Sequence, residues 1–287
     1  MPELPEVETV VRGLRKADIC NAVITGQRVG WERTLGGMST EAFASHVTGA
    51  TILRVTRRAK YIVMSLSTGW TLLIHLRMTG SLRVVSANEL PELYERVALL
   101  FADGRELRFR DTRKFGRWYL TDAPERILGK LGPEPLSAAF TPEWLAERLR
   151  RHRRMLKPLL LDQQFIAGLG NIYVDEALFA ARLHPCRLAC MVRTPGARRL
   201  HQSIQSVLRL GISRMGTSLG DGAVNFYSVA GRRGRNQDAL QVFRRDGEAC
   251  PVCGTTISRI IVGQRSTHYC KRCQPVPRKR APINKTA

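Results

Sequence analysis

The sequence predicts an α+β protein in which a leading helix and an antiparallel β domain precede a mainly helical domain and a small metal-binding module. Short apolar or alternating runs, separated by turn residues, extend from about residue 22 to residue 120 and are typical of antiparallel strands. The later half has helical spacing instead, and two Cys-x-x-Cys pairs lie near the C-terminus. A chain of 287 residues also fits about two domains of ordinary size.

The first predicted element is a helix over residues 5–16. A proline suits its first position, and its charges are acidic at the start and basic at the end, which complements the helix dipole. The apolar residues recur at the i, i+3, i+4, i+7 spacing of a single face: Val7, Val10, Val11 and Leu14. We therefore expect an amphipathic helix with one buried face.

Six strands are predicted next. Their ranges are 51–55, 60–66, 71–76, 81–85, 97–101 and 106–110. The segments 67–70 (Ser-Thr-Gly-Trp) and 102–105 (Ala-Asp-Gly-Arg) are good hairpin turns, so neighbouring strands are expected to pair antiparallel. The first domain is therefore predicted to be an antiparallel sandwich or barrel.

The second domain is predicted to be mainly α-helical. A Leu-Gly-Pro-Glu-Pro stretch at 131–135 marks the boundary, and Thr141 before Pro142 is a typical helix start. Helical patterns then continue to Leu160 and recur at 174–181 and 194–214. The Gly-rich, basic stretch 217–234 has no clear periodicity and predicts a long loop.

The charge of the chain points to a polyanionic partner. Lys and Arg number 46 against 24 Asp and Glu, a formal net charge of +22, and such a surface most often binds nucleic acid, or else an anionic membrane. The uncharged segment 61–76 is too short and too polar for a membrane span of about 20 residues, and the N-terminus lacks the features of a secretory signal. We expect a cytosolic protein without a membrane partner.

The four clustered cysteines predict one structural zinc ion. Two Cys-x-x-Cys pairs separated by 16 residues suit tetrahedral Zn²⁺, whereas a redox pair needs only one such motif. The ligands are Cys250, Cys253, Cys270 and Cys273. Four thiolates leave no open coordination position, so the metal should stabilise the module without taking part in catalysis. Between the pairs, residues 264–268 form a candidate turn facing nucleic acid.

The extreme N-terminus offers a candidate nucleophile. Pro2 follows the initiator Met1, and removal of Met1 would expose a secondary amine. An α-amino group titrates near pH ~8, so a sizeable fraction is neutral at physiological pH and can attack a sugar C1′ to give an iminium ion. Glu3 could supply or remove a proton. Composition alone favours the alternative that Pro2 and Glu3 only introduce a helix.

A basic run forms a third candidate feature. Residues 148–157 include five arginines and Lys157, and a Gly-Leu-Gly-Asn segment at 168–171 leads into a helix. Free N–H groups at a helix start can bind anions, and Asn171 could cap the helix or bond a phosphate oxygen. The alternative is a solvated basic face, but with the net charge and the zinc module nucleic-acid binding is favoured.

These features together resemble the bacterial formamidopyrimidine-DNA glycosylase family. Six separated motifs match in order over nearly the whole chain: residues 1–9 (Met-Pro-Glu-Leu-Pro-Glu-Val-Glu-Thr), Lys60-Tyr61, residues 75–80 (His-Leu-Arg-Met-Thr-Gly), residues 113–116 (Arg-Lys-Phe-Gly), residues 168–173 and the zinc finger. The resemblance implies an N-terminal catalytic β-sandwich domain (1–131), a helix-two-turn-helix DNA-binding domain (132–240) with a lesion-capping loop (217–234), a β-hairpin zinc finger (241–275) and a disordered basic tail (276–287).

The resemblance also implies a function and a set of site residues. The expected enzyme excises oxidised purines such as 8-oxoguanine and formamidopyrimidines from duplex DNA, then cleaves the strand by β,δ-elimination, and zinc is its only expected metal. The implied catalytic residues are Pro2 as nucleophile, Glu3 as acid and base, and Lys60 and Arg265, which hold phosphates at the lesion. The implied DNA-binding residues are His75, Met78, Arg113, Phe115, Lys157 and Asn171. Among these, Met78, Arg113 and Phe115 resemble residues that fill the gap left by a flipped nucleotide.

Alternatives remain within and outside the family. Leu4 favours the oxidised-purine branch over the endonuclease VIII branch, which usually has Gly there. A catalytically silent DNA-binding relative would lack Pro2, Glu3 or Lys60, and all three are present. A zinc-ribbon nucleic-acid module would explain only the C-terminus. The expectation is a bacterial, cytoplasmic and nucleoid-associated monomer that acts on damaged double-stranded DNA.

Overall fold

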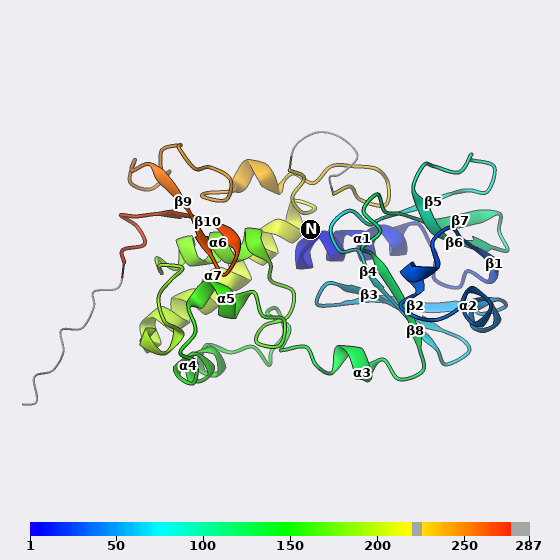
Figure 1. The fold of residues 1–287 in the computed structure, drawn as a ribbon, viewed down its shortest axis with the longest axis horizontal. Helices are drawn as coiled ribbons and strands as arrows, with labels where there is room; N and C mark the ends of the chain where they lie inside the picture. The colour runs from blue at the N-terminus through cyan, green and yellow to red at the C-terminus, as the bar shows by residue number, and fades with distance from the viewer. Residues whose placement is uncertain (220–225, 277–287) are drawn as a thin grey trace, which may run out of the picture. The chain divides into compact units, whose positions relative to one another are not determined.

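The computed structural model describes residues 1–219 and 226–276, which form two compact units (Figure 1). The first unit contains Met1–Glu134, Ile166–Gly168 and Leu208–Ala239, and the rest of the chain belongs to the second. Part of the predicted 217–234 loop and the predicted basic tail lie outside the described residues. The domain boundaries proposed from sequence stay a prediction.

The N-terminal helix α1 (Leu4–Lys16) confirms the first predicted element. Its predicted apolar face is fully buried and packs along the neighbouring strands β2 (Ile52–Arg58) and β3 (Tyr61–Leu66). Glu3 and Glu6 form a capping box. The Glu3 side chain accepts from the backbone N–H of Glu6, and the Glu6 side chain accepts from the backbone N–H of Glu3. The helix start is therefore fixed by local hydrogen bonds as well as by packing.

Two four-stranded antiparallel sheets form the β-sandwich of the first unit. One sheet has the order β1-β6-β7-β5 and the other the order β2-β3-β4-β8 (Figure 1). The strands are β1 (Ile24–Val29), β2 (Ile52–Arg58), β3 (Tyr61–Leu66), β4 (Thr71–His75), β5 (Ser81–Ser86), β6 (Glu95–Phe101), β7 (Arg105–Arg110) and β8 (Arg117–Thr121). All six predicted strands and both predicted hairpins are confirmed, and Gly69 and Gly104 supply the left-handed turn positions.

Some elements of this unit were not predicted. They are strands β1 and β8, helices α2 (Thr40–Val47) and α3 (Glu125–Leu128), and the 3₁₀ helices η1 (Glu32–Leu35) and η3 (Asn236–Ala239). The core combines the inner faces of both sheets with α1 and includes the fully buried Trp118 of β8.

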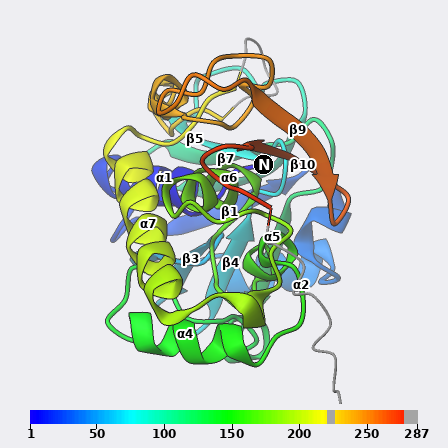
Figure 2. The same ribbon diagram turned by 90° about the vertical axis from the view of Figure 1, so that its left-hand side faces the viewer.

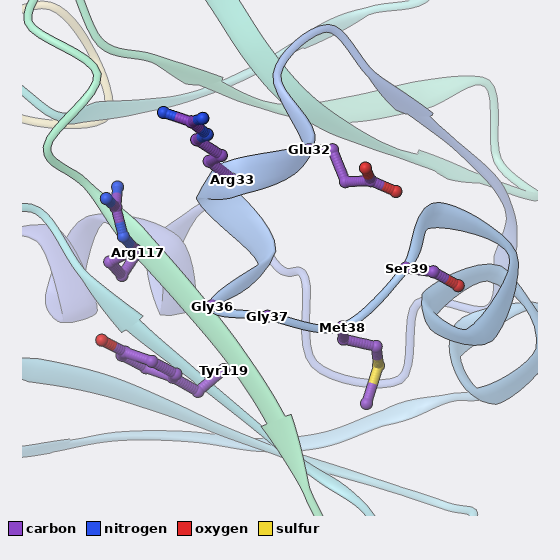
Figure 3. A pocket seen from close by; sticks show the side chains of 8 residues that line it. All are labelled: Glu32, Arg33, Gly36, Gly37, Met38, Ser39, Arg117 and Tyr119. Atoms are coloured by element: carbon purple, nitrogen blue, oxygen red, sulfur yellow. The ribbon is translucent and has the colours of Figure 1, made fainter.

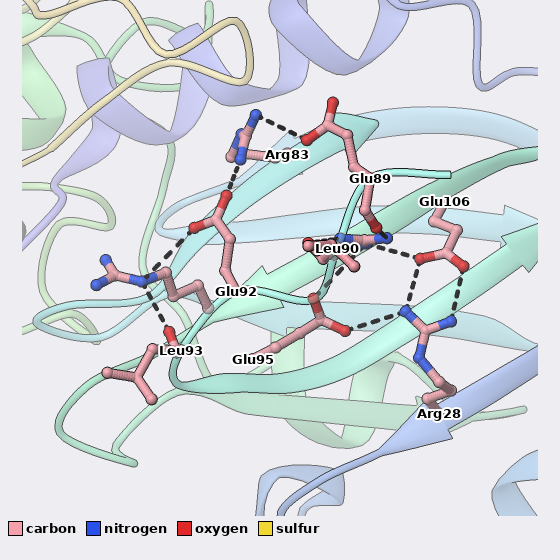
Figure 4. Close-up of polar contacts among 10 residues, drawn as sticks. Arg28, Arg83, Glu89, Leu90, Glu92, Leu93, Glu95 and Glu106 are labelled. Atoms are coloured by element: carbon pink, nitrogen blue, oxygen red, sulfur yellow. Dashed lines mark hydrogen bonds and ion pairs between the residues drawn. The ribbon is translucent and has the colours of Figure 1, made fainter. Parts of the chain in front are cut away.

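A network of ion pairs joins the strands of the first sheet (Figure 4). Arg28 donates to both carboxylate oxygens of Glu106, at 2.7 and 2.6 Å, and to Glu95 at 3.2 Å. Arg108 donates to Glu106 at 2.7 Å, and both side chains are almost completely buried. Bidentate pairs of this kind are strong, and hydrogen bonds from Arg28 lower the pKa of Glu106. These acidic groups are thus neutralised within the β domain.

The second unit is built from helices and one β-hairpin (Figure 2). The elements are α4 (Pro142–Arg150), α5 (Leu156–Leu160), α6 (Asn171–Ala180), η2 (Ala189–Met191), α7 (Thr194–Ser213, of which residues up to 207 belong here), β9 (Ile257–Val262) and β10 (Arg265–Cys270). The predicted helix start is confirmed, since the Thr141 hydroxyl accepts from Trp144 N at 3.1 Å. β9 and β10 pair antiparallel, and β10 packs on α6. No helix in the described part of the chain is long and apolar enough to cross a bilayer.

Candidate active site and nucleic-acid interface

Pro2 and Glu3 lie buried at the start of α1. Glu3 is only 3% exposed, and its N–H donates to Oε2 of Glu6 at 2.8 Å. The other oxygen of Glu6 accepts from Thr217 N at 2.7 Å, so Glu6 links the helix start to the beginning of the 217–234 segment. This role of Glu6 was not predicted from the sequence, although the i, i+3 spacing of Glu3 and Glu6 is a capping-box signal.

Gly168 supports the same helix start. Its carbonyl accepts from Leu4 N at 3.1 Å, which satisfies one of the free donors of the first turn. Its φ is +92°, and a Cβ built there would lie 2.7 Å from Leu4 Cδ1. Both the conformation and the close approach require glycine at this position.

Lys60 and His75 lie at one end of the sheet β2-β3-β4-β8. Lys60 directly precedes β3, and its neighbour Tyr61 pairs with His75 across to β4. Both side chains are largely buried, at 5% and 7% exposure. Burial, with the charges of Arg77 and Lys60, lowers the pKa of His75 to about 3. Nδ1 of this neutral imidazole accepts from Arg77 N at 3.0 Å, which leaves Nε2 as the N–H donor.

Met78, Arg113 and Phe115 gather on one surface. Met78 is 42% exposed and Phe115 is 46% exposed, which is unusual for large apolar side chains. Arg113 Nη1 lies 3.2 Å from Met78 Sδ, and its guanidinium carbon lies 4.8 Å from the Phe115 ring centroid. An apolar wedge beside a planar cation suits insertion into a base stack.

Asp111 holds the turn that presents Arg113 and Phe115. Its buried carboxylate accepts from Gly116 N at 2.7 Å and from Arg113 N at 3.2 Å, and it also accepts from the Thr79 hydroxyl. A Cβ at Gly116 would lie 2.3 Å from the Phe109 ring, so this turn needs glycine there. Asp111 was not predicted from the sequence, because its partners are mostly backbone N–H groups that have no sequence signature.

Lys157 and Asn171 converge on one backbone carbonyl in the second unit. Lys157 Nζ lies 2.8 Å from the Ser266 carbonyl oxygen, and Asn171 Nδ2 donates to the same oxygen at 3.0 Å. The suggestion that Asn171 caps α6 is wrong, because Asn171 is already the first helical residue and Gly170 precedes it. Lys157 is completely buried and also pairs with Asp175 at 2.6 Å, so it does not belong to an exposed basic face.

The finger turn exposes only part of the predicted 264–268 segment. Gln264 and Arg265 are exposed, whereas Thr267 and His268 are buried. His268 turns inward because Asp175 Oδ2 accepts from its backbone N–H at 2.9 Å and lies 3.2 Å from its Nδ1. The prediction that the whole segment faces nucleic acid is therefore wrong for Thr267 and His268.

Two adjacent carboxylates on α6 anchor the C-terminal module. Asp175 joins Lys157 to His268, and Glu176 accepts from the backbone N–H groups of residues 241, 242 and 243, each at 2.9 Å. Burial raises the pKa of Glu176, while these three hydrogen bonds oppose the shift. Neither residue was predicted from the sequence, because their partners lie far away in the chain.

The four predicted zinc ligands form one cluster. Their sulfur atoms all lie within 4.8 Å of one another, with 3.9 Å between Cys250 and Cys273 and 3.5 Å between Cys253 and Cys270. Zn–S bonds of ~2.3 Å in a tetrahedron require sulfur atoms about 3.8 Å apart. The donor set and spacing therefore fit one zinc ion. The ion would replace the hydrophobic core that this small module lacks.

The predicted site residues fall into two groups, one in each compact unit. The first unit holds Pro2, Glu3, Lys60, His75, Met78, Arg113 and Phe115, and the second holds Lys157, Asn171, Arg265 and the four cysteines. Each group contains cationic or hydrogen-bonding side chains suited to phosphates, and the first also contains the candidate nucleophile.

Comparison with protein-family models gives three consecutive matches. Residues 1–118 match the formamidopyrimidine-DNA glycosylase N-terminal domain and residues 131–221 match the formamidopyrimidine-DNA glycosylase H2TH domain. Residues 247–276 match the zinc finger found in FPG and IleRS.

Individual proteins match over almost the whole chain. The formamidopyrimidine-DNA glycosylase of Protochlamydia amoebophila is 46% identical over 96% of this chain and 99% of its own, and that of Herpetosiphon aurantiacus is 44% identical over 96% and 100%. Among solved structures, a Lactococcus lactis FPG variant bound to a Fapy-dG containing DNA has a TM-score of 0.88 at 36% identity. The Lactococcus lactis Fpg bound to an abasic site containing DNA has a TM-score of 0.87 at 36% identity. Both structures cover 96% of this chain and 100% of their own.

Proposed function

Since the chain belongs to the formamidopyrimidine-DNA glycosylase family, we propose that it removes oxidised purines from duplex DNA and then cleaves the strand at the resulting site. It is a base-excision repair glycosylase, and the lesions it takes are 8-oxoguanine and formamidopyrimidines. It acts as a single chain on double-stranded DNA. Because that substrate is the chromosome, we propose a cytoplasmic, nucleoid-associated location.

The observation that favours this function most is the buried start of α1, where Pro2 and Glu3 are adjacent and Glu3 is held by Glu6. Removal of Met1 frees the Pro2 nitrogen, whose lone pair attacks C1′ of the damaged nucleotide. The N-glycosidic bond breaks, its electrons leave with the base, and the base takes up the proton that the Pro2 nitrogen loses. Glu3 protonates the ring oxygen as the sugar opens, which gives an iminium ion between Pro2 and C1′.

The iminium ion then acts as the electron sink for strand cleavage. Removal of a C2′ proton allows the C3′–O bond to break, and the 3′ phosphate leaves. Removal of the C4′ proton then breaks the C5′–O bond and releases the 5′ phosphate, after which water hydrolyses the remaining iminium. In this scheme Lys60 and Arg265 hold the phosphates around the lesion, while His75 donates a hydrogen bond without adding charge.

The wedge residues address a separate physical problem. C1′ cannot be reached inside the duplex, so the nucleotide must be flipped out. We propose that Met78 and Phe115 fill the vacated space and that Arg113 donates to the acceptor edge of the unpaired cytosine. Asn171 would hold a phosphate. The ammonium group of Lys157 is buried, so Lys157 would act by positioning the Ser266 carbonyl, which Asn171 also contacts and which follows Arg265 in the chain.

Borohydride trapping tests the proposed function. Reduction during turnover of an 8-oxoguanine:cytosine duplex should leave a covalent adduct at Pro2, together with strand cleavage. Pro2→Gly keeps an N-terminal amine and should retain weaker cleavage, whereas protein that retains Met1 should give no adduct. The absence of both the adduct and strand cleavage with processed wild-type protein would exclude this function. Efficient excision of oxidised pyrimidines alone would instead indicate an endonuclease VIII-like enzyme.

A further inference from the structure

A shallow pocket in the first unit has no role in the proposed mechanism. Its volume is about 500 Å³, and it lies between η1 with its following loop and strand β8 (Figure 3). Two arginines, Arg33 and Arg117, line it together with the hydroxyl-bearing Tyr119. Gly36 allows the two walls to meet, since its φ is +66° and a Cβ there would lie 2.5 Å from the Tyr119 ring.

The polar groups of this pocket suit an anion. Figure 3 shows the guanidinium groups of Arg33 and Arg117 on the same side of the pocket, with the Glu32 carboxylate directed away from them. Glu32 instead accepts from the Thr40 N–H at 3.0 Å. In the described part of the chain, no ion pair is recorded for either arginine. Arg117 Nη1 donates to the carbonyls of Lys114 and Gly116, at 3.0 and 2.7 Å, and its other guanidinium nitrogens remain for a ligand.

The pocket adjoins residues already proposed to contact DNA. Cross-strand pairing aligns Tyr61, His75 and Arg117 across β3, β4 and β8, so Arg117 is the next residue in the row that begins beside Lys60. Arg117 also ends the turn that presents Arg113 and Phe115. Cross-strand neighbours project from the same face of a sheet, so this row presents several hydrogen-bond donors side by side.

The preceding segment is tied to the same turn. Lys114 Nζ lies 3.9 Å from the ring centroid of Trp31, the residue just before η1, and Arg33 lies 5.8 Å from the same ring. Cation–π contacts of this kind hold both cations near one aromatic ring without neutralising them. The wall containing Arg33 is thereby fixed next to the turn containing Phe115.

We infer that this pocket binds a backbone phosphate of the duplex, with Arg33 and Arg117 as its ligands and the Tyr119 hydroxyl as an additional donor. The inference rests on the proposed function, since it assigns a further contact to the same DNA. Two guanidinium groups are well suited to phosphate oxygens, and contacts of this kind position a protein on DNA without reading its sequence. The site lengthens the interface beyond the wedge, on the same unit.

The test compares Arg33→Ala, Arg117→Ala and the double variant with wild type and with Arg54→Ala, an exposed arginine of β2 outside the pocket. Binding to an 8-oxoguanine duplex is measured over a range of salt concentrations. Each lost phosphate contact should lower the slope of log affinity against log salt by about 1 and weaken binding at low salt several-fold. Arg33→Lys should restore the slope, and Arg54→Ala should not change it. Borohydride trapping by Arg33→Ala at saturating enzyme should remain at the wild-type level.

A neutral-phosphate scan identifies the contacted group. Methylphosphonates are placed singly along both strands, and wild-type protein should lose affinity at one position where the double variant is insensitive. Arg33→Ala is decisive, because Arg117 also bonds to the turn. If Arg33→Ala has the wild-type slope of log affinity against log salt and the wild-type methylphosphonate scan, the inference is overturned. This holds even if inorganic phosphate or pyrophosphate binds the pocket, because the pocket would then bind an anion that is not part of DNA. If wild-type protein fails to trap, the proposed function fails, but the salt and scan results still decide whether this pocket contacts DNA.

Discussion

The neutral state of His75 is determined by its surroundings. The ring is buried beside Lys60 and Arg77, and a proton there would add a third positive charge in a poorly solvated place, so its pKa falls to about 3. The imidazole can still donate one hydrogen bond from Nε2, because Nδ1 is occupied by the Arg77 N–H. The residue therefore has a directed donor whose protonation state does not change between pH 6 and pH 8, which suits the proposed contact with DNA.

The depressed pKa of His75 predicts a loss of stability in acid. Between about pH 3 and the unfolded value of 6.5, the unfolded chain binds a proton that the folded chain does not, so stability falls as the pH drops below 6.5. The expected contribution is about 2 kcal/mol lost between pH 7.5 and pH 5. Urea unfolding of zinc-loaded wild type and His75→Asn at both pH values measures it, since the variant should lose less stability over this range. An equal loss in both proteins would contradict the assigned pKa, and His46→Asn serves as the histidine control.

A second residue-scale prediction concerns Asp111. Replacing its buried carboxylate with alanine removes the acceptors for Gly116 N, Arg113 N and the Thr79 hydroxyl, and unpaired donors cost ~1–3 kcal/mol each. We expect Asp111→Ala to lower excision opposite cytosine at least tenfold and to reduce discrimination between opposite bases, since Arg113 loses its position. Single-turnover cleavage with each opposite base measures this effect. Asp103→Ala, in an exposed hairpin turn, is the control, and wild-type discrimination in Asp111→Ala would refute the positioning role.

At the scale of elements, helix α6 connects α5 to the finger hairpin through one buried charge pair. Breaking such a pair leaves an isolated charge and typically costs ~3–5 kcal/mol, whereas replacing both partners with apolar residues can cost little. We predict that Lys157→Met and Asp175→Leu each destabilise the zinc-loaded chain by that amount and that the double variant recovers only the part due to the isolated charge, because His268 still lacks the Asp175 acceptor. The double variant should nevertheless bind DNA more weakly than the wild type, because the Ser266 carbonyl loses the hydrogen bond from Lys157. Additive losses of stability would show that the two side chains are not coupled.

The predictions from sequence succeeded where structure is decided locally. Helix α1, the two hairpins and the zinc module each follow from spacing within a short segment. Strands β1 and β8 were missed because Ile24–Val29 includes Gly26 and polar residues, and because Arg117–Thr121 is only five residues long. Their assignment depends on pairing with strands distant in the chain, and no local pattern records that pairing.

The basic run shows why side-chain direction was harder to predict. Residues 148–157 look like one continuous face, yet α4 ends at Arg150 and α5 begins at Leu156, so the helical phase is lost between them. Lys157 consequently faces inward toward Asp175, a partner 18 positions away. The motifs named the site residues one by one, while Asp111, Asp175 and Glu6, which hold some of them in place, went unnoticed.

At the scale of the whole molecule, the excess positive charge of +22 and the recognition of damage make different contributions to binding. Phosphate contacts release counterions and act equally on damaged and undamaged duplexes, whereas the proposed wedge residues are expected to act only at a lesion. We therefore predict that affinity for both duplexes falls steeply with salt, with slopes that differ by no more than about 1 to 2. The ratio of the two affinities should then change by no more than about 4- to 16-fold over a fourfold range of salt, while each affinity changes by orders of magnitude. Fluorescence anisotropy measures the slopes and the affinity ratio, with matched duplexes that contain 8-oxoguanine or guanine. The salt range is 50 to 200 mM, over which affinity is expected to fall ~10³-fold or more. A ratio that collapses as steeply as the affinities would mean that lesion recognition depends on extra phosphate contacts, and the roles proposed for Met78, Arg113 and Phe115 would have to be revised.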